Sequence, residues 1–116
     1  SGDFDKPERR VECFLNSDGT YNWEKQNWQQ WFLRKAEEYG VESLIAFINS
    51  PPIFYTRNGL AHGSDGNYSN LATDHYDDFS NFIISVIKHF ADEKGEIIVS
   101  ANSKGLKDYC IKLKSE

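Results

Sequence analysis

Hydrogen-bonding, aromatic and proline residues are concentrated in one short stretch of the chain, residues 49–55 (Asn-Ser-Pro-Pro-Ile-Phe-Tyr). Asn49 and Ser50 carry donors and acceptors that suit hydroxyl groups, while Phe54 and Tyr55 carry flat apolar faces that suit sugar rings. The two prolines fix the path of the chain and lower the entropy lost in presenting these groups. One interpretation of the stretch is a saccharide-binding wall. In the alternative interpretation the prolines only turn the chain, and the aromatic rings pack on them.

Three short apolar runs predict the β-strands that must position this stretch. Residues 10–15 alternate polar and apolar types, residues 43–48 are almost continuously apolar, and residues 96–100 form the third run. Turn-forming residues 16–19 (Asn-Ser-Asp-Gly) follow the first run. A strand as apolar as residues 43–48 is typical of sheets that are covered on both faces.

Three further segments have the apolar spacing of amphipathic helices. The first runs from Asn22, a suitable N-cap, to Gly40, which suits the C′ position. The second runs from Thr73 to Gly95, and the third opens at Ser103 and continues through residue 113. The predicted order, β-α-β-α-β-α, indicates an α/β fold with parallel strands joined by crossover helices. Helices on one side cannot cover both faces of the middle strand, so we expect further cover from outside this segment.

Length, composition and charge limit the classes of function. The 116 residues suffice for a single domain, and the formal net charge of -5 comes from scattered acidic residues. Because no Lys/Arg stripe could follow a phosphate backbone, we expect no nucleic-acid partner. No run approaches the roughly 20 apolar residues that cross a bilayer, so we expect no membrane partner.

The N-terminus does not look like a natural start. The chain contains no methionine and begins with Ser1-Gly2, a pair that is typically left behind when a purification tag is cleaved off. We therefore expect residues 1–8 to be a lead-in and the natural chain to extend further. No signal-peptide pattern is present at the N-terminus, and the sequence leaves the compartment open.

An ordered series of motifs resembles the endo-β-1,6-galactanase-like branch of glycoside hydrolase family 30. The loop supplies Asn-Ser-Pro-Pro at 49–52, Tyr-Thr-Arg-Asn-Gly at 55–59 and Ser-Asn-Leu at 69–71. Residues 10–14 and 18–23 resemble the family's second barrel strand and its exit, and residues 76–79 and 86–90 resemble its third helix. The resemblance covers about residues 9–95, and residues 96–116 form a divergent tail.

The resemblance implies a (β/α)8 barrel and hydrolysis of glycosidic bonds with retention of configuration. Because such a barrel needs roughly 250 residues, the chain would be a partial TIM barrel of about three β/α units. The rest of the barrel would then cover the strand over residues 43–48. Barrel active sites are built from loops at the carboxyl ends of strands, and Asn49 stands at such an end.

The family's catalytic carboxylates have no match in this chain. Retaining glycosidases use two carboxyl groups about 5 Å apart, one as acid/base and one as nucleophile. In the resembling family the acid/base is the Glu of an Asn-Glu-Pro motif after the fourth strand, and the nucleophile follows the seventh. Asn102 matches the motif's Asn, but Ser103 and Lys104 stand where Glu and Pro belong. We assign no catalytic residue, expect the chain to be inactive alone, and carry over Asn102 and Arg10, whose family counterpart lies near the nucleophile, as substrate-binding residues.

Other residues that could ligate or react have simpler interpretations. His62, His75 and His89 lack metal-ligand spacing, and the acidic cluster over residues 74–78 suits the start of a helix. We therefore expect no metal and no cofactor.

The tryptophans and cysteines are interpreted as packing residues. Trp23, Trp28 and Trp31 have the spacing of a helix face that packs on the sheet, with a sugar platform as the alternative. Cys13 and Cys110 lie nearly a hundred residues apart and predict buried free thiols, with a disulfide as the alternative.

Two classes of function follow from these observations. The first is a fragment or truncated relative of a retaining glycoside hydrolase that acts on β-linked polysaccharide of the galactan or glucan type. The alternative is a non-catalytic α/β module that binds saccharide or a protein through residues 49–72. A phosphate-binding domain is disfavoured because no Gly-rich loop follows a strand. Open sheet edges also predict self-association, and the resemblance would suit a secreted or periplasmic parent protein.

Overall fold

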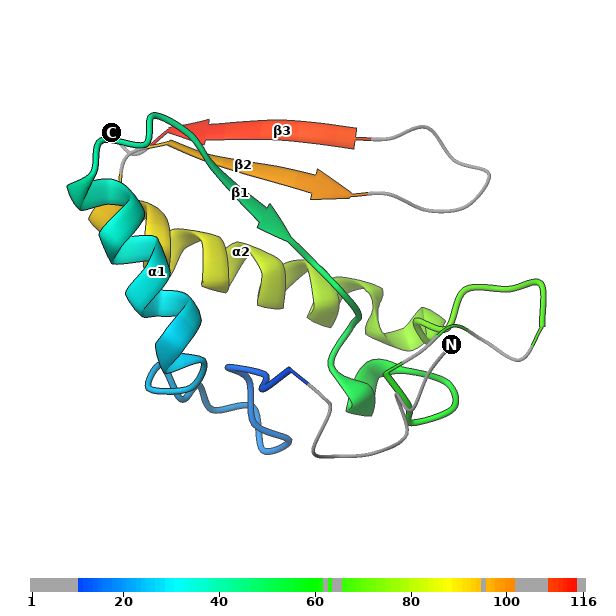
Figure 1. Cartoon of the computed structure of the whole chain (residues 1–116). Coiled ribbons are helices and arrows are strands. Elements are labelled where there is room, and N and C mark those ends of the chain that lie inside the picture. The colour runs from blue at the N-terminus through cyan, green and yellow to red at the C-terminus, as the bar shows by residue number, and fades with distance from the viewer. Residues whose placement is uncertain (1–10, 62, 64–65, 95, 102–108, 115–116) are drawn as a thin grey trace. The chain divides into compact units, whose positions relative to one another are not determined.

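The computed structural model describes residues 11–61, 63, 66–94, 96–101 and 109–114 (Figure 1). Their elements, in chain order, are α1 (Asn27–Glu38), β1 (Leu44–Phe47), the 3-10 turns η2 (Ile53–Tyr55) and η3 (Thr73–His75), α2 (Tyr76–Lys94), β2 (Glu96–Ala101) and β3 (Tyr109–Lys114). Within these ranges no helix is both long and apolar enough to cross a membrane.

The chain divides into two compact units. Unit 1 comprises Ser1–Gln26 and Ser50–Ile83, and unit 2 comprises Asn27–Asn49 and Ile84–Glu116. Unit 1 therefore contains the loop that follows β1, and unit 2 contains the sheet.

Helix α1 ends as the sequence predicts. Gly40 has a φ of +75°, the left-handed conformation that favours glycine, and its N–H donates to the Glu37 carbonyl at 2.9 Å. The Val41 N–H donates to the Ala36 carbonyl at 3.0 Å. These two bonds form a Schellman motif, so the prediction of Gly40 at C′ is confirmed.

The predicted start of α1 is wrong. Asn22 accepts a hydrogen bond from the Glu24 N–H through Oδ1 at 3.0 Å, and the helix begins only at Asn27. An asparagine side chain caps a local turn as readily as a helix, which is why the sequence pattern misplaced the boundary. The residue before the helix, Gln26, has a φ of 57° and is held by Glu12, whose Oε2 accepts from the Gln26 N–H at 2.8 Å.

The sheet has the order β1-β2-β3, with β2 between the other two strands (Figure 1). Strands β1 and β2 are parallel, in a register from Leu44 opposite Ile97 to Phe47 opposite Ser100. The predicted strands over residues 43–48 and 96–100, and their parallel pairing, are confirmed.

The last predicted helix is wrong where the structure describes it. Residues 109–114 form β3, which pairs antiparallel with β2 along its whole length, from Tyr109 opposite Ala101 to Lys114 opposite Glu96. The sequence Tyr-Cys-Ile-Lys-Leu-Lys contains alternating apolar and lysine residues that also fit a strand, and tertiary pairing overrides weak helical spacing.

The first predicted strand is also absent from the described residues. Arg10 lies outside them, and within residues 11–15 the structure has only an isolated bridge between Leu15 and Tyr21. The turn over residues 16–19 brings the chain straight back, and the Asn22 N–H donates to the Phe14 carbonyl at 2.8 Å. The segment pairs with itself rather than forming a longer strand, so the described order is α-β-α-β-β instead of β-α-β-α-β-α.

Each unit has a small apolar core of its own. In unit 1, Phe14 and Leu15 are buried, and the Phe14 ring lies 5.4 Å from that of Trp23. In unit 2, Ile87 and Ala91 of α2 are buried. A hollow of about 90 Å³ in this unit is lined by apolar residues of α1, β1 and α2, namely Leu33, Leu44, Ile45, Ala46, Val86, Ile87 and Phe90.

Strand β1 and helix α1 leave large apolar side chains in solvent. Leu44 and Ala46 are half-buried, whereas Ile45 and Phe47 on the alternate positions are 70% and 72% exposed. Trp28 is 78% exposed, so the interpretation that the tryptophans pack on the sheet is wrong for it. Trp23 precedes α1 and belongs to unit 1, so it is not on the α1 helix. The residue of α1 that lines the hollow beside β1 is Leu33 rather than a tryptophan.

Candidate functional site

The candidate site is the loop of unit 1 that follows β1. Asn49 lies two residues past the strand, is exposed, and is the last residue of the segment 27–49 of unit 2. Ser50 is half-buried and is the first residue of the segment 50–83 of unit 1. Pro52 is buried, and its carbonyl accepts from the Tyr55 N–H at 2.9 Å, which starts the 3-10 turn η2. The second proline thus anchors the turn that carries the two aromatic residues.

Two aromatic rings of this turn contact each other and the start of α2. Phe54 and Tyr55 pack edge to face, with ring centroids 4.9 Å apart. The other ring at Tyr55 is that of His75, which stacks on it at 4.8 Å with an interplanar angle of 28°. One face of the tyrosine is therefore covered by a histidine, which the sequence interpretation did not anticipate.

Backbone hydrogen bonds close the base of the loop. The Ala72 N–H donates to the Tyr55 carbonyl at 2.9 Å, and the Arg57 N–H donates to the Asn70 carbonyl at 2.7 Å. Between these bonds, Thr56 and Leu71 form an isolated antiparallel bridge. The aromatic turn and the first residues before α2 are thus held as one closed structure.

Side-chain amides fix the far part of the same loop. Asn58 Oδ1 accepts from Asn70 Nδ2 at 2.9 Å and from the Leu60 N–H at 3.0 Å. Gly59, between them, has a φ of +70°, and the Arg57 guanidinium lies 5.2 Å from the centre of the Tyr68 ring. Such a connected set of bonds favours a single loop conformation, which lowers the entropy cost of binding.

The electrostatic environment of Tyr55 keeps its hydroxyl protonated. Burial raises the pKa of Tyr55, and the Asp78 carboxylate and, where they ionise, the side chains of Tyr21 and Cys13 raise it further. Burial also raises the pKa of the Cys13 thiol, against the lowering effects of the Leu15 backbone and Lys25. At neutral pH this region therefore presents a phenol that can donate a hydrogen bond, beside a neutral thiol.

Cys13 is a free, half-buried thiol, which agrees with the prediction for this residue. The side chain of Cys110 lies outside the described residues. Of the predicted site residues, Arg10 and Asn102 also lie outside them. The structure brings Phe54 and Tyr55 together and places Asn49 and Ser50 in different units.

Two residues of the site were missed as functional candidates. The sequence analysis interprets His75 as a non-ligating residue and Asp78 as part of the acidic start of a helix, but the histidine Nδ1 lies 2.8 Å from the Asp78 Oδ2. Their spacing of three residues at the start of a helix was the available signal. No group of three or more His, Cys, Asp or Glu side chains in the described part of the chain could hold a metal ion.

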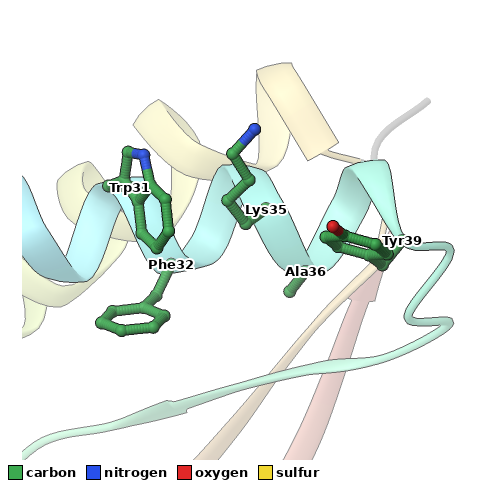
Figure 2. Close-up of a pocket in the computed structure, with 5 residues that line it drawn as sticks. All are labelled: Trp31, Phe32, Lys35, Ala36 and Tyr39. Carbon is green, nitrogen blue, oxygen red and sulfur yellow. The ribbon is translucent and has the colours of Figure 1, made fainter.

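A second hollow lies on α1, in unit 2. It measures about 440 Å³ and is lined by Trp31, Phe32, Lys35, Ala36 and Tyr39 (Figure 2). The Lys35 Nζ lies 5.9 Å from the centre of the Trp31 ring and 2.6 Å from the Glu38 Oε2. The hollow combines apolar rings with one paired cation, and no carboxylate or hydroxyl group other than that of Tyr39 lines it.

The described residues combine helices with a three-stranded mixed sheet, and the strand β1 is followed along the chain by a loop that backbone hydrogen bonds close. Residues 2–102 match O-glycosyl hydrolase family 30. The chain belongs to this family and is therefore a relative of glycoside hydrolases.

A solved structure is similar to this chain. It is the crystal structure of a conserved exported protein from Bacteroides fragilis, with 39% sequence identity and a TM-score of 0.71. The similarity covers 78% of this chain and 18% of that one, so the chain matches less than a fifth of that protein's length. No curated protein matches the chain.

Proposed function

We propose that the loop after β1 binds the substrate of a retaining glycoside hydrolase that acts on β-linked polysaccharide. One observation carries the proposal: in a member of this family, a closed loop two residues beyond a strand holds Tyr55 half-buried beside Phe54. Aromatic faces bind sugar rings, and the polar side chain of Ser50, in the same unit, suits a hydroxyl group. Galactan or glucan is the proposed polymer, as in the endo-β-1,6-galactanase-like branch.

The proposed scaffold is part of a (β/α)8 barrel. In support, β1 and β2 pair in parallel across α2, and Ile45 and Phe47 of β1 have exposed side chains that further barrel units would cover. A barrel of this kind would have no antiparallel strand in the place of β3. Strand β3 begins at Tyr109, however, and the family match ends before it, at residue 102.

In this proposal the chain contributes binding groups rather than the reacting carboxylates. We assign no pair of carboxylates among the described residues to the acid/base and nucleophile roles. Incubation of the chain alone with a β-1,6-linked galactan is therefore expected to release no reducing sugar. Hydrolysis by the chain alone would contradict this part of the proposal.

Calorimetric titration with β-1,6-linked galacto- and gluco-oligosaccharides tests the binding role. We expect saturable binding at roughly millimolar ligand, and a loss of about tenfold in affinity for Tyr55→Ala. Tyr39→Ala, which removes an exposed ring from the α1 hollow, is the matched control and should bind as the parent does. Equal affinity of Tyr55→Ala and the parent would refute the assignment. A loss confined to Tyr39→Ala would place the ligand on α1.

The two sugars distinguish the branches of the family. Tighter binding of the galacto-oligosaccharide supports the galactanase-like assignment, and tighter binding of the gluco-oligosaccharide supports a glucan substrate. No binding of either sugar would favour the alternative of a protein-binding module.

A further inference from the structure

We infer that His75 is a positioning residue for the sugar-binding face of Tyr55, an inference that rests on the proposed function. The imidazole stacks on one side of the tyrosine ring at 4.8 Å, with the planes 28° apart. That side of the ring is closed to a ligand. A stacked sugar is therefore restricted to the part of the tyrosine ring that the histidine does not cover.

Asp78 fixes the histidine in turn. His75 Nδ1 and Asp78 Oδ2 are 2.8 Å apart, and an ionised carboxylate can only accept a hydrogen bond, so Nδ1 must carry the proton. This bond holds the plane of the imidazole from the first turn of α2. Asp78 thus orients the imidazole of His75, and the imidazole in turn orients the ring of Tyr55.

The backbone supports the same arrangement. The Tyr55 carbonyl accepts from the Ala72 N–H at 2.9 Å, and the Ala72 carbonyl accepts from the His75 N–H at 3.0 Å. Tyr55 and His75 are therefore tied to the same residue through the main chain as well as through their rings. Loss of the imidazole would leave the turn in place but release the tyrosine side chain to other rotamers.

The charge around Tyr55 agrees with this geometry. Asp78 contributes to the raised pKa of Tyr55, after burial, so the carboxylate that holds the histidine also acts on the tyrosine. The side chains of Tyr55, His75 and Asp78 therefore interact with one another through a ring stack, a hydrogen bond and charge. His75 and Asp78 are 33% and 52% exposed, which allows substitution without opening a core.

Four variants of the full chain test the inference by titration with the same β-1,6-linked oligosaccharide. We expect His75→Ala to weaken binding about tenfold, and His75→Phe, which keeps a stacking ring without the Asp78 bond, to stay within about threefold of the parent. Asp78→Asn should weaken binding about threefold. Asp77→Asn removes the same charge from the same helical turn and should bind as the parent does.

The restored affinity of His75→Phe tests the stacking ring, and the difference between Asp78→Asn and Asp77→Asn tests the bond that orients it. Equal losses in His75→Ala and His75→Phe, or equal effects of Asp78→Asn and Asp77→Asn, would overturn the inference. If His75→Ala fails to fold, the comparison of His75→Phe with the two aspartate variants still decides it.

The outcomes separate this inference from the proposed function. Loss of binding in Tyr55→Ala with full binding in His75→Ala overturns the role of the histidine and leaves the sugar site standing. If the parent binds no sugar, the ring protons of Tyr55 still report the stack by nuclear magnetic resonance. The part of their ring-current shift that comes from His75 should be lost in His75→Ala and largely kept in His75→Phe, while the part from Phe54 remains. An unchanged shift in His75→Ala would overturn the positioning role.

Discussion

The loop of unit 1 and the α1 and β1 surfaces of unit 2 both carry aromatic residues, but they hold them differently. In the loop, Tyr55 is half-buried and its ring contacts those of Phe54 and His75. In unit 2, Tyr39 is 85% exposed and Phe47 is 72% exposed. Rings fixed by their own neighbours at a solvent boundary suit a ligand, whereas apolar side chains in solvent on regular elements suit burial against further protein. The difference fits the proposed sugar-binding role of the loop and the predicted self-association through unit 2.

The largest expected effect separates a buried ring from an exposed one. Phe14→Ala should lower the free energy of unfolding by about 3 kcal/mol, because it leaves a cavity beside Leu15 and Trp23. Phe32→Ala, at a position that is 66% exposed, should change it by no more than about 0.5 kcal/mol. Denaturant unfolding followed by tryptophan fluorescence measures both. Equal losses would mean that the ring of Phe32 is covered in solution.

The exposed side chains of β1 are expected to drive self-association. A lysine at position 47 places a charge among these apolar groups, so Phe47→Lys should weaken association about tenfold. Tyr68→Lys adds the same charge in the loop of unit 1, at a position that is 54% exposed, and should leave association unchanged. Light scattering over a concentration series measures the effect. A monomeric parent protein at high concentration would show that unit 2 needs no partner surface.

The left-handed glycine after α1 gives a smaller effect. Gly40→Ala should cost about 1 kcal/mol in the free energy of unfolding, since a Cβ disfavours a φ of +75° although nothing lies within 4 Å of it. Gly63→Ala, which also meets open space and has no such φ, is the control and should be nearly neutral. Thermal unfolding compares the two. A neutral Gly40→Ala would show that the end of α1 is free to rearrange.

The smallest expected effect is a change in the titration of Tyr55. Asp78→Asn should lower the pKa of Tyr55 towards its ordinary value, because the carboxylate is one of the groups that raise it, after burial. Phenolate absorbance of each variant, with Tyr55→Phe as the blank, measures the shift, and Asp77→Asn should leave it unchanged. If the pKa of Tyr55 stays the same in Asp78→Asn, the Asp78 carboxylate does not act electrostatically on the tyrosine.

The same shift has a defined effect on stability. A pKa raised in the folded state means that the folded protein holds the proton more tightly than the unfolded chain does. The stabilisation is fully present below the ordinary pKa of tyrosine and is lost as the pH rises through the folded value. Tyr55→Phe should therefore reduce the alkaline loss of stability relative to the parent.

Local chemistry was predicted well from the sequence. The apolar runs predicted β1 and β2, glycine chemistry predicted the end of α1, and the proline-aromatic stretch predicted the loop that holds Tyr55. The motif series also predicted the family, over most of the range that matches it. These features depend on neighbours within a few residues or on short motifs, which a single sequence contains.

The tertiary structure decided what depended on distant partners. Residues 109–114 became an antiparallel strand because β2 offered an edge for pairing, and residues 11–15 formed no longer strand because the turn after them returned the chain on itself. His75 became part of the candidate site only because the loop folds back onto the start of α2, which brings it against Tyr55 across 20 positions of the chain. Spacing along a chain determines local conformation, but contact between remote residues depends on the packing that the whole fold selects.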